Sequence, residues 1–263
     1  MIRGAALVSL FTIVAGCLDQ LGPDVGAKQF NTCVDEDSDP TTAISFERDI
    51  RQGIFNRPTI HCVKCHTPGG ATPIGWKLAF GTSAAMEKLG TTGPLVGFLT
   101  DATLLADGAE CSVAGWTAPK LEPEIAIHLG AGGEGVVGIS AAIELADADR
   151  PPTEIEAVLA GDIYHRAVVL DRGAAPTPLA HPIAARIERD GEEYATTADA
   201  EVEVGQIEDL AAWTVDYLRH FGVETAAGEV IISGSVVPLL DIAPGQELRN
   251  TIEGVGSLSV RIT

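Results

Sequence analysis

"PKLEPEIAIHLG", residues Pro119–Gly130, decides the fold class that we predict for this chain. Hydrophobic and polar residues alternate along it, which is typical of a half-buried β-strand. Side chains two residues apart on a strand project from the same face, so Glu122 and Glu124 lie side by side. Because two neighbouring carboxylates repel each other, either both lie on a solvated face or they hold a divalent cation between them. Carboxylate oxygens suit hard metal ions.

A third carboxylate occurs in a similar setting. In "AAIELAD" (141–147), Glu144 stands between apolar residues, and a charge inside a buried strand is costly unless it is paired or ligates a metal. Three carboxylates with open positions for water and substrate would form a site for a bidentate 2-oxo or enolic acid. The cation would stabilise the enolate as its charge develops.

The remaining patterns between 74 and 263 predict many strands and few helices. "GWKLAF" (75–80), "GEVIISGS" (228–235) and "SLSVRI" (257–262) predict strands, and "APGQELR" (243–249) predicts a turn. "SAAMEKLG" predicts a short helix that Gly90 ends. "GQIEDLAAWTVDYLRHFG" (205–222) predicts the clearest helix, which Gly222 ends. Its apolar face contains Ile207, Leu210, Thr214, Leu218 and Phe221. We therefore predict an α+β fold, a mixed β-roll with flanking helices.

Composition excludes one class of partner. The 263 residues carry a net charge of -20, so no basic stripe could offset phosphate repulsion, and we expect no nucleic-acid binding.

The N-terminus predicts an exported protein. Arg3 precedes an apolar run, Ala5–Ala15, which is too short to span a bilayer but suits a secretory signal. The run ends in "VAGC", which matches a bacterial lipobox. Residues 1–17 are then a signal peptide, and Cys17 carries a lipid that anchors the protein to a membrane. The alternatives are a buried N-terminal segment or a start codon assigned too early.

Residues 18–73 begin with an acidic linker and continue into a cytochrome-c-like segment. "CVKCH" matches a c-type haem motif, in which Cys62 and Cys65 add to the haem vinyl groups and His66 binds the iron. The segment is short for a haem fold. It also lacks a methionine that could be the second ligand of the iron, because the chain's methionines are Met1 and Met86, and Met86 lies in the next region. We interpret it as a truncated module, with haem c attachment as the alternative.

Several motifs together resemble one family. In order along the chain, "IGWKLAFGTSAAMEKLG", "PKLEPEIAIHLG", "AAIELAD", "GEVIISGSVVP" and "APGQELRNTIEGVGSLSVRI" are similar to the 2-keto-4-pentenoate hydratase family. That family includes 2-oxohepta-3-ene-1,7-dioate hydratase and 4-oxalocrotonate decarboxylase, and it belongs to the fumarylacetoacetate hydrolase superfamily. The resemblance covers about residues 74–263. The helical region that usually precedes "GWK" in the family is replaced here by the signal and haem-like segments.

The resemblance implies a site, residue by residue. Glu122 and Glu124 correspond to the family's E-x-E metal ligands and Glu144 to its third carboxylate, with Mg²⁺ or Mn²⁺ as the ion and Glu122 also acting in catalysis. Lys77 corresponds to a lysine near the substrate's carboxylate or 2-oxo group. Ser233 and Ser235 match a turn that lines the pocket.

Other polar residues have smaller predicted roles. We expect Lys120 to tune the charge of the E-x-E pair. "AGDIYHRAVVL" (160–170) places Asp162, Tyr164 and His165 where hydratases often have "DN". We expect His165 to be a surface or hydrogen-bonded residue, with a role as an acid/base group as the alternative. We expect structural roles for His128 and His181.

The resemblance also implies an activity. We expect a homo-oligomeric, metal-dependent hydratase of aromatic catabolism that adds water to a small 2-hydroxy-2,4-dienoic or 2-oxoalkenoic acid. A decarboxylase of the 4-oxalocrotonate type and a hydrolase that cleaves a carbon–carbon bond of an acylpyruvate are alternatives. An electron-transfer lipoprotein with a passenger domain is an alternative from another class, which a Soret band would favour. The leader indicates export, whereas the family is cytoplasmic.

Overall fold

Strands β5 (Pro119–Leu129) and β6 (Val136–Asp147) form the long antiparallel pair around which the described part of the chain is built. The computed structural model describes residues 71–263. Successive side chains of a strand point to opposite faces. Ile125 and Ile127 therefore enter the main hydrophobic core, whereas Glu122 and Glu124 project from the other face of β5.

The larger of two sheets is mixed and has eight strands. They follow the order β2-β1-β10-β5-β6-β7-β3, and β11 pairs with the N-terminal part of β5. β1 is parallel to β10 and β3 is parallel to β7, and the other neighbours are antiparallel. Besides β5 and β6, its strands are β1 (Pro73–Ala79), β2 (Leu95–Thr100), β3 (Leu104–Leu105), β7 (His165–Val169), β10 (Val230–Ile232) and β11 (Leu240–Asp241).

One short turn joins the two ends of this sheet. β2 ends at Thr100 and β3 begins at Leu104, with only the 3₁₀-helix η2 (Asp101–Thr103) between them. Because β2 and β3 lie at opposite ends of the strand order, the sheet has to curl until its edges approach each other. The resulting roll encloses a second hydrophobic cluster, to which Ala126 of β5 and Ala142 of β6 belong.

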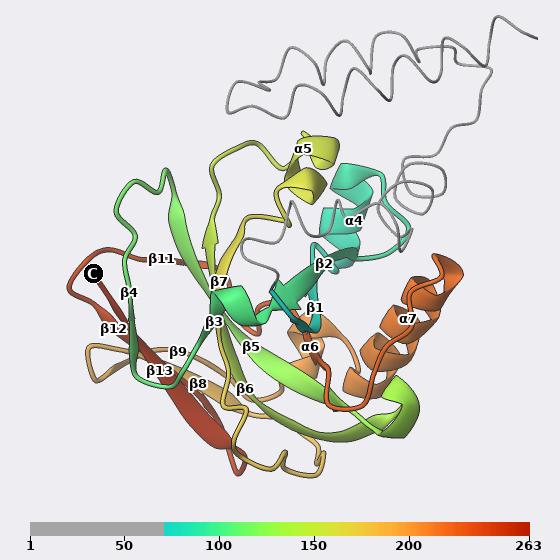
Figure 1. Ribbon diagram of the computed structural model, residues 1–263. Helices are drawn as coiled ribbons and strands as arrows, with labels where there is room; N and C mark the ends of the chain where they lie inside the picture. Colours follow the sequence, from blue (N-terminus) through green and yellow to red (C-terminus); the bar gives the residue numbers. More distant parts are fainter. Residues whose placement is uncertain (1–70) are drawn as a thin grey trace, which may run out of the picture. The chain divides into compact units, whose positions relative to one another are not determined.

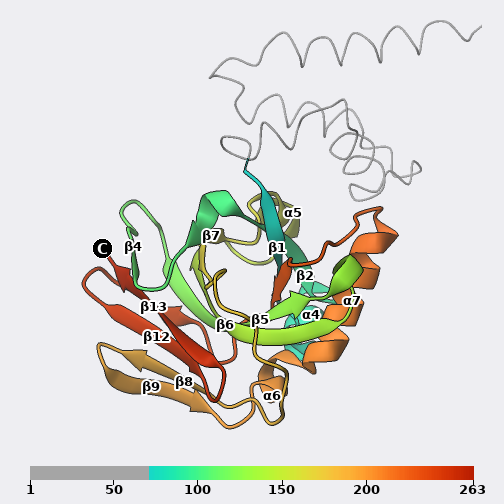
Figure 2. The same cartoon turned by 60° about the horizontal axis from the view of Figure 1, so that its bottom comes forward.

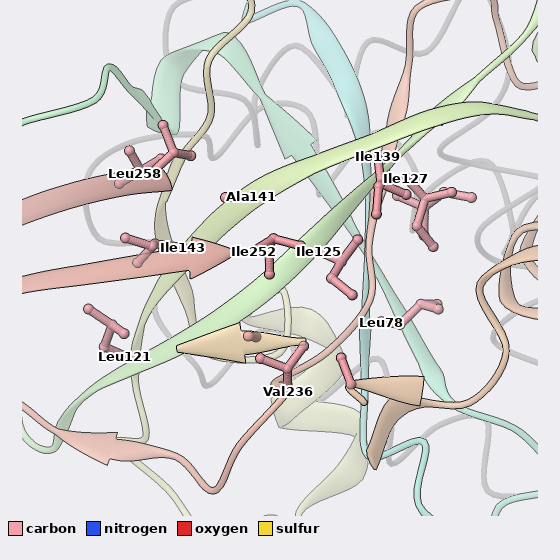
Figure 3. Packing of buried hydrophobic residues seen from close by; sticks show 14 of the residues in the cluster. Leu78, Leu121, Ile125, Ile127, Ile139, Ala141, Ile143, Val236, Ile252 and Leu258 are labelled. Atoms are coloured by element: carbon pink, nitrogen blue, oxygen red, sulfur yellow. The ribbon is translucent and has the colours of Figure 1, made fainter. Parts of the chain in front are cut away.

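The smaller sheet packs on the outside of the roll, against β5 and β6 (Figure 2). Its five strands have the order β4-β13-β12-β8-β9. Figure 3 shows Ile252 of β12 and Leu258 of β13 beside Ile125 and Ile143 of the long pair, in the main core. The strands of this sheet are β4 (Ala109–Cys111), β8 (Ala185–Arg189), β9 (Glu192–Thr197), β12 (Glu247–Ile252) and β13 (Gly256–Ile262).

Between residues 71 and 263 the helices are few and mostly short (Figure 1). As predicted, α4 (Ser83–Leu89) ends at Gly90, whose φ of 68° is left-handed. Helix α7 (Ile207–His220) is confirmed, but its buried face is centred on Ala211 and Val215, so Leu210 and Phe221 are only half-buried. The others are α5 (Ile155–Ala160), α6 (Glu201–Val204) and the 3₁₀-helix η3 (Ala131–Gly133).

The predicted α+β fold, a mixed β-roll with flanking helices, is confirmed between residues 71 and 263. No helix in this part of the chain is long and apolar enough to cross a membrane. The predicted signal peptide (1–17) with its lipid anchor Cys17, and the haem motif of Cys62, Cys65 and His66, lie outside the described residues.

Asn250 of β12 connects the two sheets. Its side-chain amide is buried and donates to the Glu124 carbonyl (2.9 Å) and to the Ala142 carbonyl (2.8 Å). Those two residues face each other across the β5–β6 ladder. One side chain therefore satisfies a backbone acceptor on each long strand, next to a predicted metal ligand.

We expect Asn250→Ala to lower the free energy of unfolding by about 2–3 kcal/mol, because two buried carbonyls lose their donor. Urea denaturation followed by tryptophan fluorescence measures this. The control is Thr251→Ala, at the next, half-buried position of β12. Equal stability of the two variants would show that Asn250 does not connect the sheets energetically.

Candidate functional site

A buried ion pair forms the centre of the candidate site. Lys77 of β1 and Glu144 of β6 are each 1% exposed, and the Lys77 ammonium donates a hydrogen bond to Oε1 of Glu144. The same ammonium donates to the carbonyl of Ile163 at 2.9 Å. Both side chains point into the roll, because the neighbouring residues Trp76 and Leu145 pack into the outer core.

His165 of β7 holds the same carboxylate from another side. Its Nδ1 lies 2.8 Å from Oε1 of Glu144, and its Nε2 lies 3.0 Å from the hydroxyl of Thr103 in η2. The imidazole is buried, so of the two predicted possibilities the hydrogen-bonded one is correct. Glu144 therefore has two partners, which fix its orientation.

Glu122 and Glu124 project into the roll beside this pair. Glu122 faces Glu144 directly across the β5–β6 ladder, and Glu124 is fully buried. Oε2 of Glu124 accepts the backbone N–H of Gly234 at 2.8 Å, whereas Oε1 is buried without a hydrogen-bond partner. The structure thus places all three predicted carboxylates and Lys77 within one enclosed region.

The environment gives these carboxyl groups different proton affinities. Burial raises the pKa of Glu122 to about 7, and the negative charge of Glu144 adds to this effect. Burial, with Glu144 and Glu122, also raises the pKa of Glu124. Burial works in the same direction on Glu144, but Lys77 and His165 outweigh it and lower the pKa of that carboxyl. Glu144 is the carboxylate that stays charged.

Lys77 keeps its proton for the complementary reason. Burial disfavours its charge, but Glu144, and then Glu122 and Asp162, outweigh burial and raise the pKa of the amine. The ammonium is therefore a permanent cation inside the roll.

A strained segment provides the carbonyl that Lys77 contacts. Asp162, Ile163 and Tyr164 have φ values of 52°, 52° and 67°, so three consecutive non-glycine residues are left-handed. Such residues persist only where the surrounding structure holds them. The Asp162 carboxylate accepts the N–H of Phe98 at 2.9 Å, which joins this segment to β2.

The predicted serines contact the backbone. The Ser233 hydroxyl accepts the N–H of Ile125 (3.1 Å) and donates to the Gly234 carbonyl (2.8 Å), and the Ser235 hydroxyl donates to the Val237 carbonyl (2.6 Å). Together these bonds shape the turn in which Gly234, at φ 87°, directs its N–H toward Glu124.

Three other polar residues have separate partners. Lys120 pairs with the exposed Asp241, and Nε2 of His128 lies 2.9 Å from the Ser140 hydroxyl. Nδ1 of His181 lies 2.6 Å from Oε2 of Glu201. Oε1 of Glu201 in turn accepts the N–H of Ile207, the first residue of α7.

The interior carboxylates fit a divalent cation. The orphaned Oε1 of Glu124 is a buried acceptor of the type that Mg²⁺ and Mn²⁺ bind, and Glu122 adds a carboxylate on the same strand face. Among the described residues, three potential metal ligands whose atoms all lie within 4.8 Å of one another occur at His181, Glu201 and Glu208, which are not the interior carboxylates. Binding of one ion by Glu122, Glu124 and Glu144 would therefore require a side chain to move.

Two parts of the site carry no clear signal in the sequence. The Ile163 carbonyl reaches Lys77 only because three residues adopt left-handed φ values, and no glycine marks that conformation. Thr103 reaches His165 only because the sheet curls. The burial of His165 follows from its position in β7, which a strand prediction there would have indicated.

Comparison with known proteins gives consistent results. The chain is 28% identical over 222 residues to a 2-hydroxyhexa-2,4-dienoate hydratase of Comamonas testosteroni, covering 78% of this chain and 84% of that protein. It is 25% identical over 206 residues to a 4-oxalocrotonate decarboxylase of a Pseudomonas species, covering 74% and 80%. These similarities support the predicted resemblance to the 2-keto-4-pentenoate hydratase family.

A solved structure has the same fold. The 4-oxalocrotonate decarboxylase of Pseudomonas putida G7, complexed with magnesium and adipate, superposes with a TM-score of 0.64 at 22% identity, covering 74% of this chain and 79% of that one. No family model matches the chain.

Gly97 of β2 allows Lys77 and Asp162 to approach each other. A Cβ atom at this position would lie 2.5 Å from Oδ1 of Asp162 and 2.7 Å from Cγ of Lys77. We expect Gly97→Ala to lower the free energy of unfolding by about 1–3 kcal/mol, because a crowded interior has to shift.

Thermal denaturation of the full chain measures this effect. Gly81→Ala is the matched control, since its Cβ would have Pro94 as its nearest neighbour, at an ordinary 3.4 Å. If Gly97→Ala were as stable as Gly81→Ala, the close approach of Lys77 and Asp162 would not be a constraint.

Proposed function

We propose that this chain is a metal-dependent hydratase that adds water to a 2-hydroxy-2,4-dienoic acid or its 2-oxoalkenoic tautomer. The observation that carries the proposal is the buried Lys77–Glu144 ion pair beside two carboxyl groups whose charge burial disfavours. A cation and several carboxylates inside an apolar roll suit a small, anionic, oxygen-rich substrate. The similarity to a 2-hydroxyhexa-2,4-dienoate hydratase supports the same substrate class.

The proposed roles follow from position and charge. Glu122, Glu124 and Glu144 would hold Mg²⁺ or Mn²⁺, which when bound supplies a Lewis acid near the 2-oxygen of the substrate. The Lys77 ammonium would bind and polarise the carboxylate or the 2-oxygen. Ser233 and Ser235 would shape the wall of the substrate site.

Glu122 is the carboxyl group best suited to proton transfer with water. Without a cation, burial raises its pKa to about 7, so it can take up or release a proton near neutral pH, and a bound cation would shift it toward the carboxylate. A group with such a pKa exchanges protons efficiently. We therefore assign it a catalytic role in addition to metal binding.

Decarboxylation is the second candidate. Two 4-oxalocrotonate decarboxylases match the chain at 25% and 23% identity. Loss of CO₂ from a 2-oxo acid of this type and addition of water both require an electrophile at the 2-oxo group. The same residues would therefore act in either reaction, and the substrate decides between them.

The test is the disappearance of the dienoate ultraviolet band when the full chain is mixed with 2-hydroxypenta-2,4-dienoate and Mg²⁺. We expect a chelator to abolish turnover. Glu122→Gln and Glu124→Gln should each lower kcat/KM on the order of 10²–10³-fold, because each removes a carboxylate that would hold the cation. CO₂ release from 4-oxalocrotonate is measured in parallel to test decarboxylation.

Glu192→Gln, at an exposed position of β9, is the matched control and should retain full activity. Turnover that is insensitive to the chelator and to Glu124→Gln would contradict the proposed function.

A further inference from the structure

The carboxyl group of Asp162 reaches the interior that contains Lys77. Its Oδ1 and the aliphatic part of Lys77 both lie directly over Gly97, since a Cβ there would be 2.5 Å from Oδ1, 2.7 Å from Cγ and 3.0 Å from Cδ of Lys77. Asp162 thus lies along the lysine stem, on the side of the roll formed by β1 and β2.

One oxygen of this carboxyl group is fixed and the other is free to react. Oδ1 accepts the Phe98 N–H at 2.9 Å, and within residues 71–263 this is the hydrogen bond that the Asp162 carboxyl makes. Oδ2 is left for a substrate. The left-handed conformations of Asp162, Ile163 and Tyr164 hold the group in this position, and Lys77 fixes the same segment through the Ile163 carbonyl.

The surroundings of Asp162 raise the pKa of its carboxyl group. Burial raises the pKa of this carboxyl to about 6, although the neighbouring His165 and Lys77 oppose the effect, and Glu144 adds slightly to it. Near neutral pH both protonation states are populated, which suits an acid that is used and reloaded in each turnover.

We propose that Asp162 is the acid that protonates the terminal carbon, C5, of the 2-hydroxy-2,4-dienoate, and this role rests on the proposed function. Lys77 is a permanent ammonium beside Glu144 and already binds oxygen atoms. Glu122 and Glu124 project from a different strand, β5. Asp162 is then the remaining interior carboxyl group, among the described residues, with a free oxygen and no ion-pair partner.

The step balances as follows. The Asp162 O–H bond breaks and its proton forms a C–H bond with C5, using the C4=C5 electron pair. The C2=C3 pair moves to C3=C4, the enol O–H at C2 loses its proton to water, and C2 becomes a ketone. Asp162 is left as a carboxylate and takes a proton from solvent, so no proton is gained or lost overall. The product is the 2-oxo-3-enoate, to which water then adds at C4.

This division of the reaction gives a sharp test in the full chain with Mg²⁺. Asp162→Asn keeps an oxygen that can accept the Phe98 N–H but has no acidic proton. We expect it to slow ketonisation of 2-hydroxypenta-2,4-dienoate by about 10²–10⁴-fold, with hydration of preformed 2-oxopent-3-enoate unchanged within about threefold. In D₂O, the wild type should incorporate one deuterium at C5 and the variant should not do so above the rate without protein.

Asp190→Asn is the matched control. Asp190 also has a left-handed φ, 54°, and its Oδ1 accepts a backbone N–H, that of Glu247 at 2.8 Å, but it lies in the smaller sheet. The Asp190→Asn variant should ketonise 2-hydroxypenta-2,4-dienoate at the wild-type rate. Thermal denaturation checks that Asp162→Asn is folded. Asp162→Glu, which restores an acidic proton, should then recover part of the ketonisation rate.

The outcomes separate this proposal from the proposed function. If the wild type hydrates the enone and Asp162→Asn ketonises the dienoate as fast as the wild type, the role of Asp162 is overturned and the proposed function stands. If the wild type ketonises the dienoate but does not hydrate the enone, and the variant has lost ketonisation, the role of Asp162 is supported and the hydratase function is overturned. Equal loss of both reactions shows a structural role for Asp162, and a wild type inactive in both overturns both proposals.

Discussion

The ion pair between Lys77 and Glu144 is the interaction on which the candidate site depends. Removing two charges from water carries a desolvation penalty of several kcal/mol per ion, and such a pair persists only where further hydrogen bonds satisfy both groups. The Ile163 carbonyl supplies one of these bonds and His165 another. The need to satisfy this pair therefore fixes β1, β6, β7 and the segment before β7 relative to one another.

The curl of the larger sheet makes this burial possible. A flat sheet would leave the face that carries Glu122 and Glu124 exposed to solvent. Because η2 connects opposite ends of the strand order, that face becomes the inside of a roll. The smaller sheet then packs on the outer face, and the Asn250 side chain of that sheet donates hydrogen bonds to the backbone of both long strands.

Enclosure also separates the acidic groups by function. Glu144 has two positively polarised partners and its pKa is lowered, whereas burial raises the pKa of Glu122 and of Asp162 to about 7 and about 6. Chemically similar carboxyl groups thus become one permanent anion and two groups able to exchange protons. Such separation is what acid–base chemistry on a small organic acid requires.

The sequence by itself determined strands β1, β5, β6, β10 and β13, helix α7, and the placement of Glu122 and Glu124 on one face, because period-2 and period-3.6 patterns are local properties. It also indicated Lys77 and Glu144 through the resemblance to a family. Only the tertiary structure decided that Lys77 pairs with Glu144, that His165 contacts the same carboxylate while Thr103 holds the other ring nitrogen of His165, and that Asp162 enters the roll. These contacts join residues that are 21 to 86 positions apart, and they depend on sheet curl and on a strained left-handed segment, neither of which a local pattern encodes.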